Sequence, residues 1–157
     1  VFVYGYDRFF SRCEEVGISG IIIPDMPFEE QGEAKVPANE HGVEVVTLVA
    51  PTSKRERIQK IAESAEGFIY LVSSMSVTGV RTEITTDLST IVSEIKRHTD
   101  IPVAIGFGIS TPEQAGRLSK FADGVIVGSA IVRTVAQHGM EAKQALRDQI
   151  SDMKREL

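Results

Sequence analysis

The chain has 157 residues, the length of one ordinary domain, and 42% of them are hydrophobic, enough for a sizeable core. Its net charge is −5, with acidic and basic residues interleaved, which excludes the basic surface of a nucleic-acid-binding protein. No apolar run is long enough to span a membrane, and the single cysteine, Cys13, cannot form an internal disulfide. These features predict a single domain, residues 1–157, that acts in a reducing cytoplasm and binds neither nucleic acid nor a membrane.

Five runs of apolar, largely β-branched residues predict strands. Most runs are continuous instead of alternating, so both faces are expected to be buried, as in parallel strands that helices cover. Successive runs begin 23, 24, 34 and 23 residues apart, about the length of one strand, one helix and two loops. Residues 1–4 (VFVY) also indicate the tail of a strand, which predicts a segment before Val1. The five runs are 20–25, 43–51, 67–74, 101–108 and 124–130.

The segments between these runs have apolar residues at helical spacing. In 110–123, Ser110 or Thr111 can cap the helix, with Pro112 in the first turn, where proline fits. Segment 28–42 is weaker, because Gly32 and Pro37 interrupt it, and it predicts only a short or broken helix. The other predicted helices are 6–17, with Asp7 as a possible N-cap, 52–67, capped by Thr or Ser, 86–99, and a final helix at about 140–156.

Repetition of strand and helix predicts the α/β class, and two architectures share that pattern. One is an open doubly wound sheet with a nucleotide crevice. The other is a (β/α)₈ TIM barrel. No GxGxxG motif follows a predicted strand, which weakens the first. Because a barrel needs eight strands, the sequence predicts a TIM barrel of which only the later five β-α units are present, an incomplete barrel lacking the first three units.

Glycines lie at the ends of the last two predicted strands, at the edge where ligands bind in parallel α/β folds. Gly106 and Gly108 flank Phe107, and Gly128 precedes Ser129, with a predicted helix start close behind each pair. Backbone N–H groups beside a glycine can approach an anion closely, a helix N-terminus adds partial positive charge, and the serine hydroxyl adds a donor. Two such pairs favour a phosphate site over the alternative, close packing of a helix on a strand.

The remaining candidates at strand ends are less specific. Segment 73–87 is long and polar with small residues, so it indicates equally a lid over the site or an ordinary surface loop. Asp25, between two prolines, has the chemistry of an acid or base, although a structural role is favoured. Tyr70 indicates a core tyrosine. No histidine lies at a strand end and no Cys, His and Asp cluster has zinc spacing, so no metal site is predicted.

Four motifs in order, "GIIIPDMPFEE", "GFIYLVSSMSVTGVR", "IPVAIGFGISTPEQA" and "ADGVIVGSAIV", resemble the tryptophan synthase alpha chain family. The resemblance is most specific where Tyr70 and "SVTG" are followed by "GFGIS". It spans almost all of this chain, and it covers the later part of the family's chain, from after the third strand to the final helix. It implies a (β/α)₈ lyase of L-tryptophan biosynthesis, which cleaves indole-3-glycerol phosphate to indole and glyceraldehyde 3-phosphate by a retro-aldol reaction.

The resemblance also implies roles for individual residues. The family's two catalytic carboxylates, a glutamate and an aspartate, have no counterpart in this chain. Both are therefore expected before Val1. The isolated chain is therefore expected to bind phosphate weakly and to be inactive. By motif, the phosphate would be held by Gly108, Gly128 and Ser129, with Phe107 and Gly79 close by. The pocket for the indole and glycerol parts would be lined by Ile22, Leu48, Tyr70 and Phe107. The lid would contain Thr78 and Gly79, with Thr78 positioning the catalytic aspartate.

The resemblance implies no cofactor for this chain. Pyridoxal phosphate belongs to the family's partner, the beta subunit, in an alpha2beta2 assembly. Two alternatives stay open from the sequence. One is another phosphate-binding TIM barrel, of the ribulose-phosphate epimerase or thiamine-phosphate synthase type, although an epimerase would need metal-ligating histidines at strand ends. The other is a non-catalytic half-barrel that binds a partner, since unpaired sheet edges invite pairing with another chain.

Overall fold

Five parallel strands form one sheet in the computed structural model, which describes residues 1–73 and 88–157. Each strand pairs with the strand before it in the sequence, in the order β1-β2-β3-β4-β5. A doubly wound sheet instead reverses its strand order at a switch point, so the sequential order agrees with a run of barrel units. The predicted α/β class is confirmed. The strands are β1 Gly20–Ile22, β2 Glu44–Val49, β3 Ile69–Val72, β4 Val103–Gly106 and β5 Gly124–Val125.

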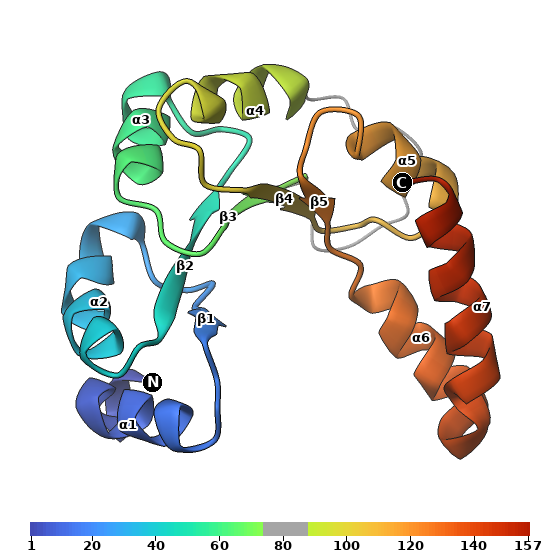
Figure 1. The fold of residues 1–157 in the computed structure, drawn as a ribbon, viewed down its shortest axis with the longest axis horizontal. Helices are drawn as coiled ribbons and strands as arrows, with labels where there is room; N and C mark the ends of the chain where they lie inside the picture. The colour runs from blue at the N-terminus through green and yellow to red at the C-terminus, as the bar shows by residue number, and fades with distance from the viewer. Residues whose placement is uncertain (74–87) are drawn as a thin grey trace.

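The chain forms an arch, with the first four helices on its outer side and the strands on its inner side (Figure 1). Helices α6 and α7 pack against each other beyond β5. Within the described ranges no helix is both long enough and apolar enough to cross a membrane. The helices are η1 Phe2–Tyr4, α1 Tyr6–Glu15, η2 Phe28–Glu30, α2 Gln31–Glu40, α3 Arg55–Glu63, α4 Leu88–Lys96, α5 Pro112–Leu118, α6 Ser129–His138, η3 Gly139–Glu141 and α7 Ala142–Arg155.

The strand indicated at residues 1–4 is wrong, because Phe2–Tyr4 is a 3₁₀ turn. The Tyr4 N–H donates to the Val1 carbonyl at 3.0 Å, which closes a turn and prevents an extended conformation. Gly5 follows with a φ of 90° and is the N-cap of α1. Asp7 therefore lies in the first turn of the helix instead of capping it.

Three other features differ from the sequence predictions, because helices begin or continue at residues where the local sequence indicates a break, another cap or a strand. Helix α2 runs for ten residues through Pro37, so the expected break at the proline is wrong, although the helix is shorter than the segment 28–42. Ala34 and Ala38 are fully buried in the cluster between α1, α2 and β2, and this packing outweighs the hydrogen bond that proline removes. The N-cap of α3 is Lys54, not Thr or Ser. Strand β5 ends at Val125, well short of residue 130, because α6 begins at 129.

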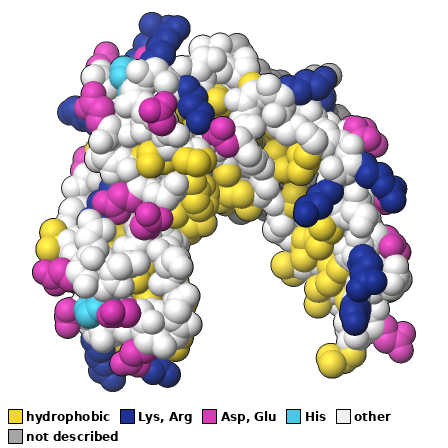
Figure 2. Space-filling model, viewed as in Figure 1, with side chains coloured by type: hydrophobic (Ala, Val, Ile, Leu, Met, Phe, Trp, Pro, Cys, Tyr) yellow, Lys and Arg dark blue, Asp and Glu magenta, His cyan; other side chains and the backbone are white. Residues whose placement is uncertain are grey.

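The two faces of the sheet are covered differently. The convex face packs on the helices and forms the main core, with fully buried residues such as Ile69, Leu71 and Ile105. The concave face lines the hollow of the arch, where Figure 2 shows hydrophobic side chains gathered. Burial of both faces is wrong for β1, whose Ile22 is 39% exposed, because β2 is its only partner strand among the described residues.

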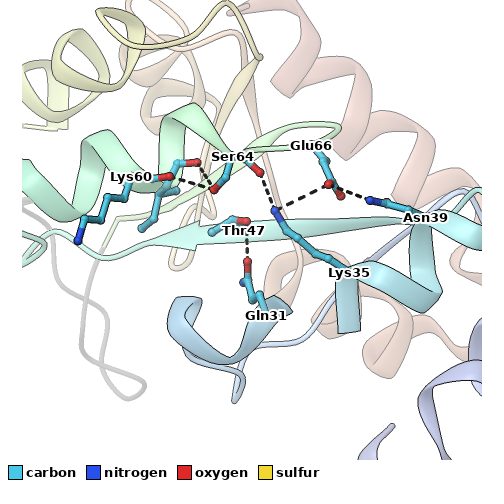
Figure 3. Close-up of polar contacts among 8 residues, drawn as sticks. Gln31, Lys35, Asn39, Thr47, Lys60, Ser64 and Glu66 are labelled. Carbon is cyan, nitrogen blue, oxygen red and sulfur yellow. Dashed lines mark hydrogen bonds and ion pairs between the residues drawn. The ribbon is translucent and has the colours of Figure 1, made fainter. Parts of the chain in front are cut away.

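Polar side chains join α2 to the unit that follows it (Figure 3). The Lys35 ammonium donates to the Ser64 carbonyl at 2.6 Å, just beyond the C-terminus of α3, and lies 3.9 Å from the Glu66 carboxylate. A cation at this end complements the helix dipole. Closer to the sheet, the buried Thr47 hydroxyl donates to the Gln31 side chain at 2.9 Å. These contacts fix α2 against both β2 and the end of α3.

Candidate functional site

Tyr70 and Phe107 meet at the C-terminal edge of β3 and β4. Their ring centroids are 6.3 Å apart with the planes at 72°, an edge-to-face contact. Tyr70 is 8% exposed and Phe107 is 44% exposed, so one ring is fixed in the sheet and the other faces outward. Burial raises the pKa of Tyr70, and a hydrogen bond with the backbone of Phe107 offsets part of that rise. The pair offers a neutral aromatic surface at this edge.

Gly106 leaves room for the ring of Tyr70. A Cβ atom at Gly106 would lie 2.0 Å from the Tyr70 hydroxyl oxygen and 2.4 Å from Cζ, far inside van der Waals contact. Position 106, on the concave side of β4, therefore requires a residue without a side chain. Close packing, the alternative to a ligand site, explains this first glycine of the GFG motif.

Replacing Gly106 with alanine is expected to lower the free energy of unfolding by about 1–3 kcal/mol, because the rigid phenol ring has to leave its place. Urea unfolding measures the change. Gly32→Ala is the matched control, since a Cβ at Gly32 meets nothing within 4 Å and alanine favours the helix. Wild-type stability in Gly106→Ala would contradict the packing role.

Gly108 and Gly128 have no such packing role among the described residues. A Cβ atom at either position would meet nothing within 4 Å. Gly108 has a φ of 80°, a conformation that strains any side chain. Gly128 has a φ of −110°, so its conformation does not demand glycine. Open space beside both backbones is what the close approach of a ligand requires.

The N-terminus of α6 lies open at the same edge of the sheet. Gly128 is its N-cap, Ser129 its first residue, and no side chain of the described residues caps it. Val125 is registered with Ile105, so Gly128 and Gly108 each lie three residues beyond a paired position. The first N–H groups of a helix have no partner inside it, so α6 presents free donors and partial positive charge here.

Helix α5 begins at the same edge with its first donors already used. Thr111 is the N-cap, one of the two residues expected, and its hydroxyl accepts from the Gln114 N–H at 3.3 Å. The Gln114 side chain in turn accepts from the N–H groups of Ser110 and Thr111, at 2.8 and 3.3 Å. Because this capping box occupies the first N–H groups of α5, only α6 offers free N–H donors to a phosphate, where the sequence indicated two helix starts.

Thr111→Ala is expected to lower the free energy of unfolding by about 1 kcal/mol, because the Gln114 N–H loses its partner at a helix start. Thermal or urea unfolding gives the value. Thr111→Ser retains the hydroxyl and should stay close to wild type. Equal losses in both variants would show that the lost methyl group, and not the cap, sets the stability.

The predicted pocket residues lie on the concave face but not all together. Leu48 is registered with Tyr70 and is half-buried. It also lines a cavity of about 560 Å³ with Phe28 and residues at the start of α3. Ile22 is one strand further away, is registered with Val46, and lines a separate cavity of about 340 Å³. Tyr70, Phe107 and Leu48 thus form one group, and Ile22 lies at its margin.

Other candidates have different outcomes. Thr78 and Gly79 lie outside the described residues. Asp25 is exposed in the loop after β1. Sequence reasoning missed Ser73, which is 4% exposed and donates its hydroxyl to the Phe107 carbonyl. The available signal was a small hydroxyl residue immediately after a buried strand.

Comparison with known proteins gives a family match over the whole chain. The family model described as "Tryptophan synthase alpha chain" matches residues 1–157. The chain belongs to the tryptophan synthase alpha chain family. A relative of that name from Lacticaseibacillus casei is 50% identical over 93% of this chain and 54% of its own length. Another from Lactiplantibacillus plantarum is 48% identical over 100% of this chain and 59% of its own.

Solved structures agree with this family. The tryptophan synthase a2b2 complex from Pyrococcus furiosus matches with a TM-score of 0.85 and 33% identity, over 97% of this chain and 62% of that chain. Tryptophan synthase from Mycobacterium tuberculosis matches with a TM-score of 0.85 and 33% identity, over 99% and 58%. The chain thus spans a little over half the length of the curated relatives it matches. The epimerase and thiamine-phosphate synthase alternatives are not favoured.

Proposed function

We propose that this chain supplies the phosphate-binding portion of a tryptophan synthase alpha subunit, which cleaves indole-3-glycerol phosphate to indole and glyceraldehyde 3-phosphate. Family membership supports the reaction. The observation that carries the phosphate site is the uncapped N-terminus of α6 beside Gly108 and Gly128, two glycines whose open side no described residue fills. Backbone donors and a helix N-terminus together suit a phosphate group.

The proposed roles follow the position of each group along the edge. The substrate phosphate accepts from the N–H groups of Gly108 and Ser129 and from the Ser129 hydroxyl. The indole ring lies against Tyr70 and Phe107, with Leu48 beside them and Ile22 at the margin. Thr78 and Gly79 keep the lid role that the family resemblance implies.

The cleavage itself needs an acid and a base that these groups do not supply. An acid protonates indole C3 while a base takes the indole N–H proton. The bond between C3 and the glycerol carbon then breaks, the hydroxyl group on that carbon gives up its proton and becomes the aldehyde, and the indole nitrogen regains a proton. Carboxylates with tuned pKa values suit both tasks. We place the two carboxylates outside residues 1–157, so the chain alone should bind phosphate without turnover. On the concave face of the described sheet, the registered residues Leu48, Tyr70, Ala104 and Gly124 include no carboxylate.

The proposed partner is a tryptophan synthase beta subunit in an alpha2beta2 assembly. The alpha chain would need no cofactor, and pyridoxal phosphate would belong to the beta subunit. The related Pyrococcus furiosus protein is described as an a2b2 complex. As a biosynthetic lyase, the assembly would act in the cytoplasm.

Indole release from indole-3-glycerol phosphate tests this proposal. The 157-residue chain is assayed alone, with a beta subunit, and as the complete reading frame that encodes it. We expect indole only from the complete reading frame, and faster release with the beta subunit. Turnover by the 157-residue chain alone would show that it holds its own catalytic groups. No turnover by the complete reading frame would reject the lyase function.

A further inference from the structure

We propose that Ser73 is a positioning residue of the phosphate site, which holds the peptide group between Phe107 and Gly108 so that the Gly108 N–H faces the start of α6. This inference rests on the proposed phosphate site. It adds a residue to which the family resemblance assigned no role, and it gives the mechanism by which β3 orients a donor at the end of β4.

Ser73 binds two consecutive carbonyl groups at the end of β4. Its backbone N–H donates to the Gly106 carbonyl at 2.8 Å, which extends the pairing of β3 with β4 by one residue. Its hydroxyl donates to the next carbonyl, that of Phe107. Ser73 is 4% exposed, so water does not compete strongly for this hydroxyl.

The Phe107 backbone needs such support. Its φ is 74°, the only positive φ of a non-glycine residue in the described parts of the chain. A bulky side chain in this region costs about 1–3 kcal/mol and persists only where surrounding contacts determine it. The Tyr70 ring also packs edge to face against the Phe107 ring. Two side chains from β3 and its end therefore hold one strained residue of the next strand.

The direction of the Gly108 N–H follows from the planar trans peptide. A carbonyl and the N–H that follows it point in opposite directions across the peptide bond, and no cis peptide occurs in the described residues. Ser73 draws the Phe107 carbonyl toward β3, so the Gly108 N–H points away from β3. The neighbour of β4 on that other side is β5, after which Gly128 and Ser129 begin α6. No described residue accepts a hydrogen bond from the Gly108 N–H.

An NMR titration of the chain with inorganic phosphate tests this role through the amide signals of Gly108 and Ser129. In the wild type both signals should shift. In Ser73→Ala, the affinity should fall about tenfold. The Gly108 shift should shrink while the Ser129 signal still responds. Ser73→Thr keeps the hydroxyl and should bind like the wild type.

Two further variants separate positioning from stability. Thr47→Val removes another buried hydroxyl with a side-chain partner, on the convex face of β2, so it should lower stability and leave phosphate affinity unchanged. If Ser73→Ala does not fold, Ser73→Cys keeps a side-chain atom in the place of the hydroxyl and gives the same test with a much weaker donor.

The outcomes are distinguishable. Wild-type affinity in Ser73→Ala or Ser73→Cys overturns the role of Ser73 while the phosphate site stands. An equal loss of affinity in Thr47→Val overturns it too, because any destabilisation would then suffice. If phosphate shifts neither amide in the wild type, the phosphate site fails and the role of Ser73 fails with it.

Discussion

Gly128→Asp is expected to lower phosphate affinity at least about 100-fold while the stability of the chain is kept or raised. The new carboxylate would stand at the N-cap of α6 and accept from its first N–H groups, as a capping aspartate does. It would thus occupy the donors that phosphate needs and complement the helix dipole. It would also repel the anion, by about 4 kcal/mol per pair of unit charges at 4 Å near a protein surface.

Phosphate titration and urea unfolding of the same variant measure the two effects separately. Gln137→Glu is the matched control, because it adds one negative charge at an exposed position near the opposite end of α6. It should change neither affinity nor stability by much. A similar loss of affinity in both variants would mean that net charge, and not the N-terminus of α6, governs binding. Wild-type affinity in Gly128→Asp would remove α6 from the site.

Leu71→Ala is expected to lower the free energy of unfolding by about 2–5 kcal/mol, the largest change in stability that we expect. Leu71 is fully buried on the convex face of β3, the middle strand of the five, in the cluster that includes Ile61 and Ile105. Truncation removes its contacts and leaves a cavity that a sheet covered by helices cannot readily close. Because single domains are stable by only about 5–15 kcal/mol, the variant should lose a large share of its stability.

Urea unfolding of Leu71→Ala beside Leu157→Ala checks this expectation. Leu157 is 60% exposed at the C-terminus, and its truncation should stay within about 0.5 kcal/mol of the wild type. If Leu71→Ala costs no more than Leu157→Ala, the convex core is not where the stability of the sheet arises.

The strands were predictable because their signal is local. Continuous runs such as 43–51 and 67–74 indicate burial on two faces, and both contain strands of the observed sheet. Helix α2 was not predictable, because Pro37 is a local breaker and the burial of Ala34 and Ala38 that overrides it arises only in the tertiary fold. The end of β5 was missed for a related reason. The apolar run continues through 126–127 and hides the point where α6 begins.

The candidate site divides in the same way. The positions of Gly108, Gly128 and Ser129 beyond β4 and β5 could be predicted, because strand ends in a parallel sheet are recognisable from the sequence, and their role in phosphate binding stays a prediction. The different role of Gly106 was not visible, since it depends on the ring of Tyr70 from the neighbouring strand. Ser73 was missed because its role depends on register: only the pairing of Val72 with Gly106 brings the Phe107 carbonyl within its reach.

The sequential strand order also bears on how the chain folds. Registered partners in neighbouring strands are separated by 20 to 34 residues along the chain. Each new strand therefore closes a loop of similar size, and doubling such a loop would cost only about 0.6 kcal/mol in entropy. The entropic cost of adding a unit does not grow with the number of units already in place. For the five described strands, nucleation can start at any adjacent pair and spread in either direction, without waiting for distant parts of the chain to meet.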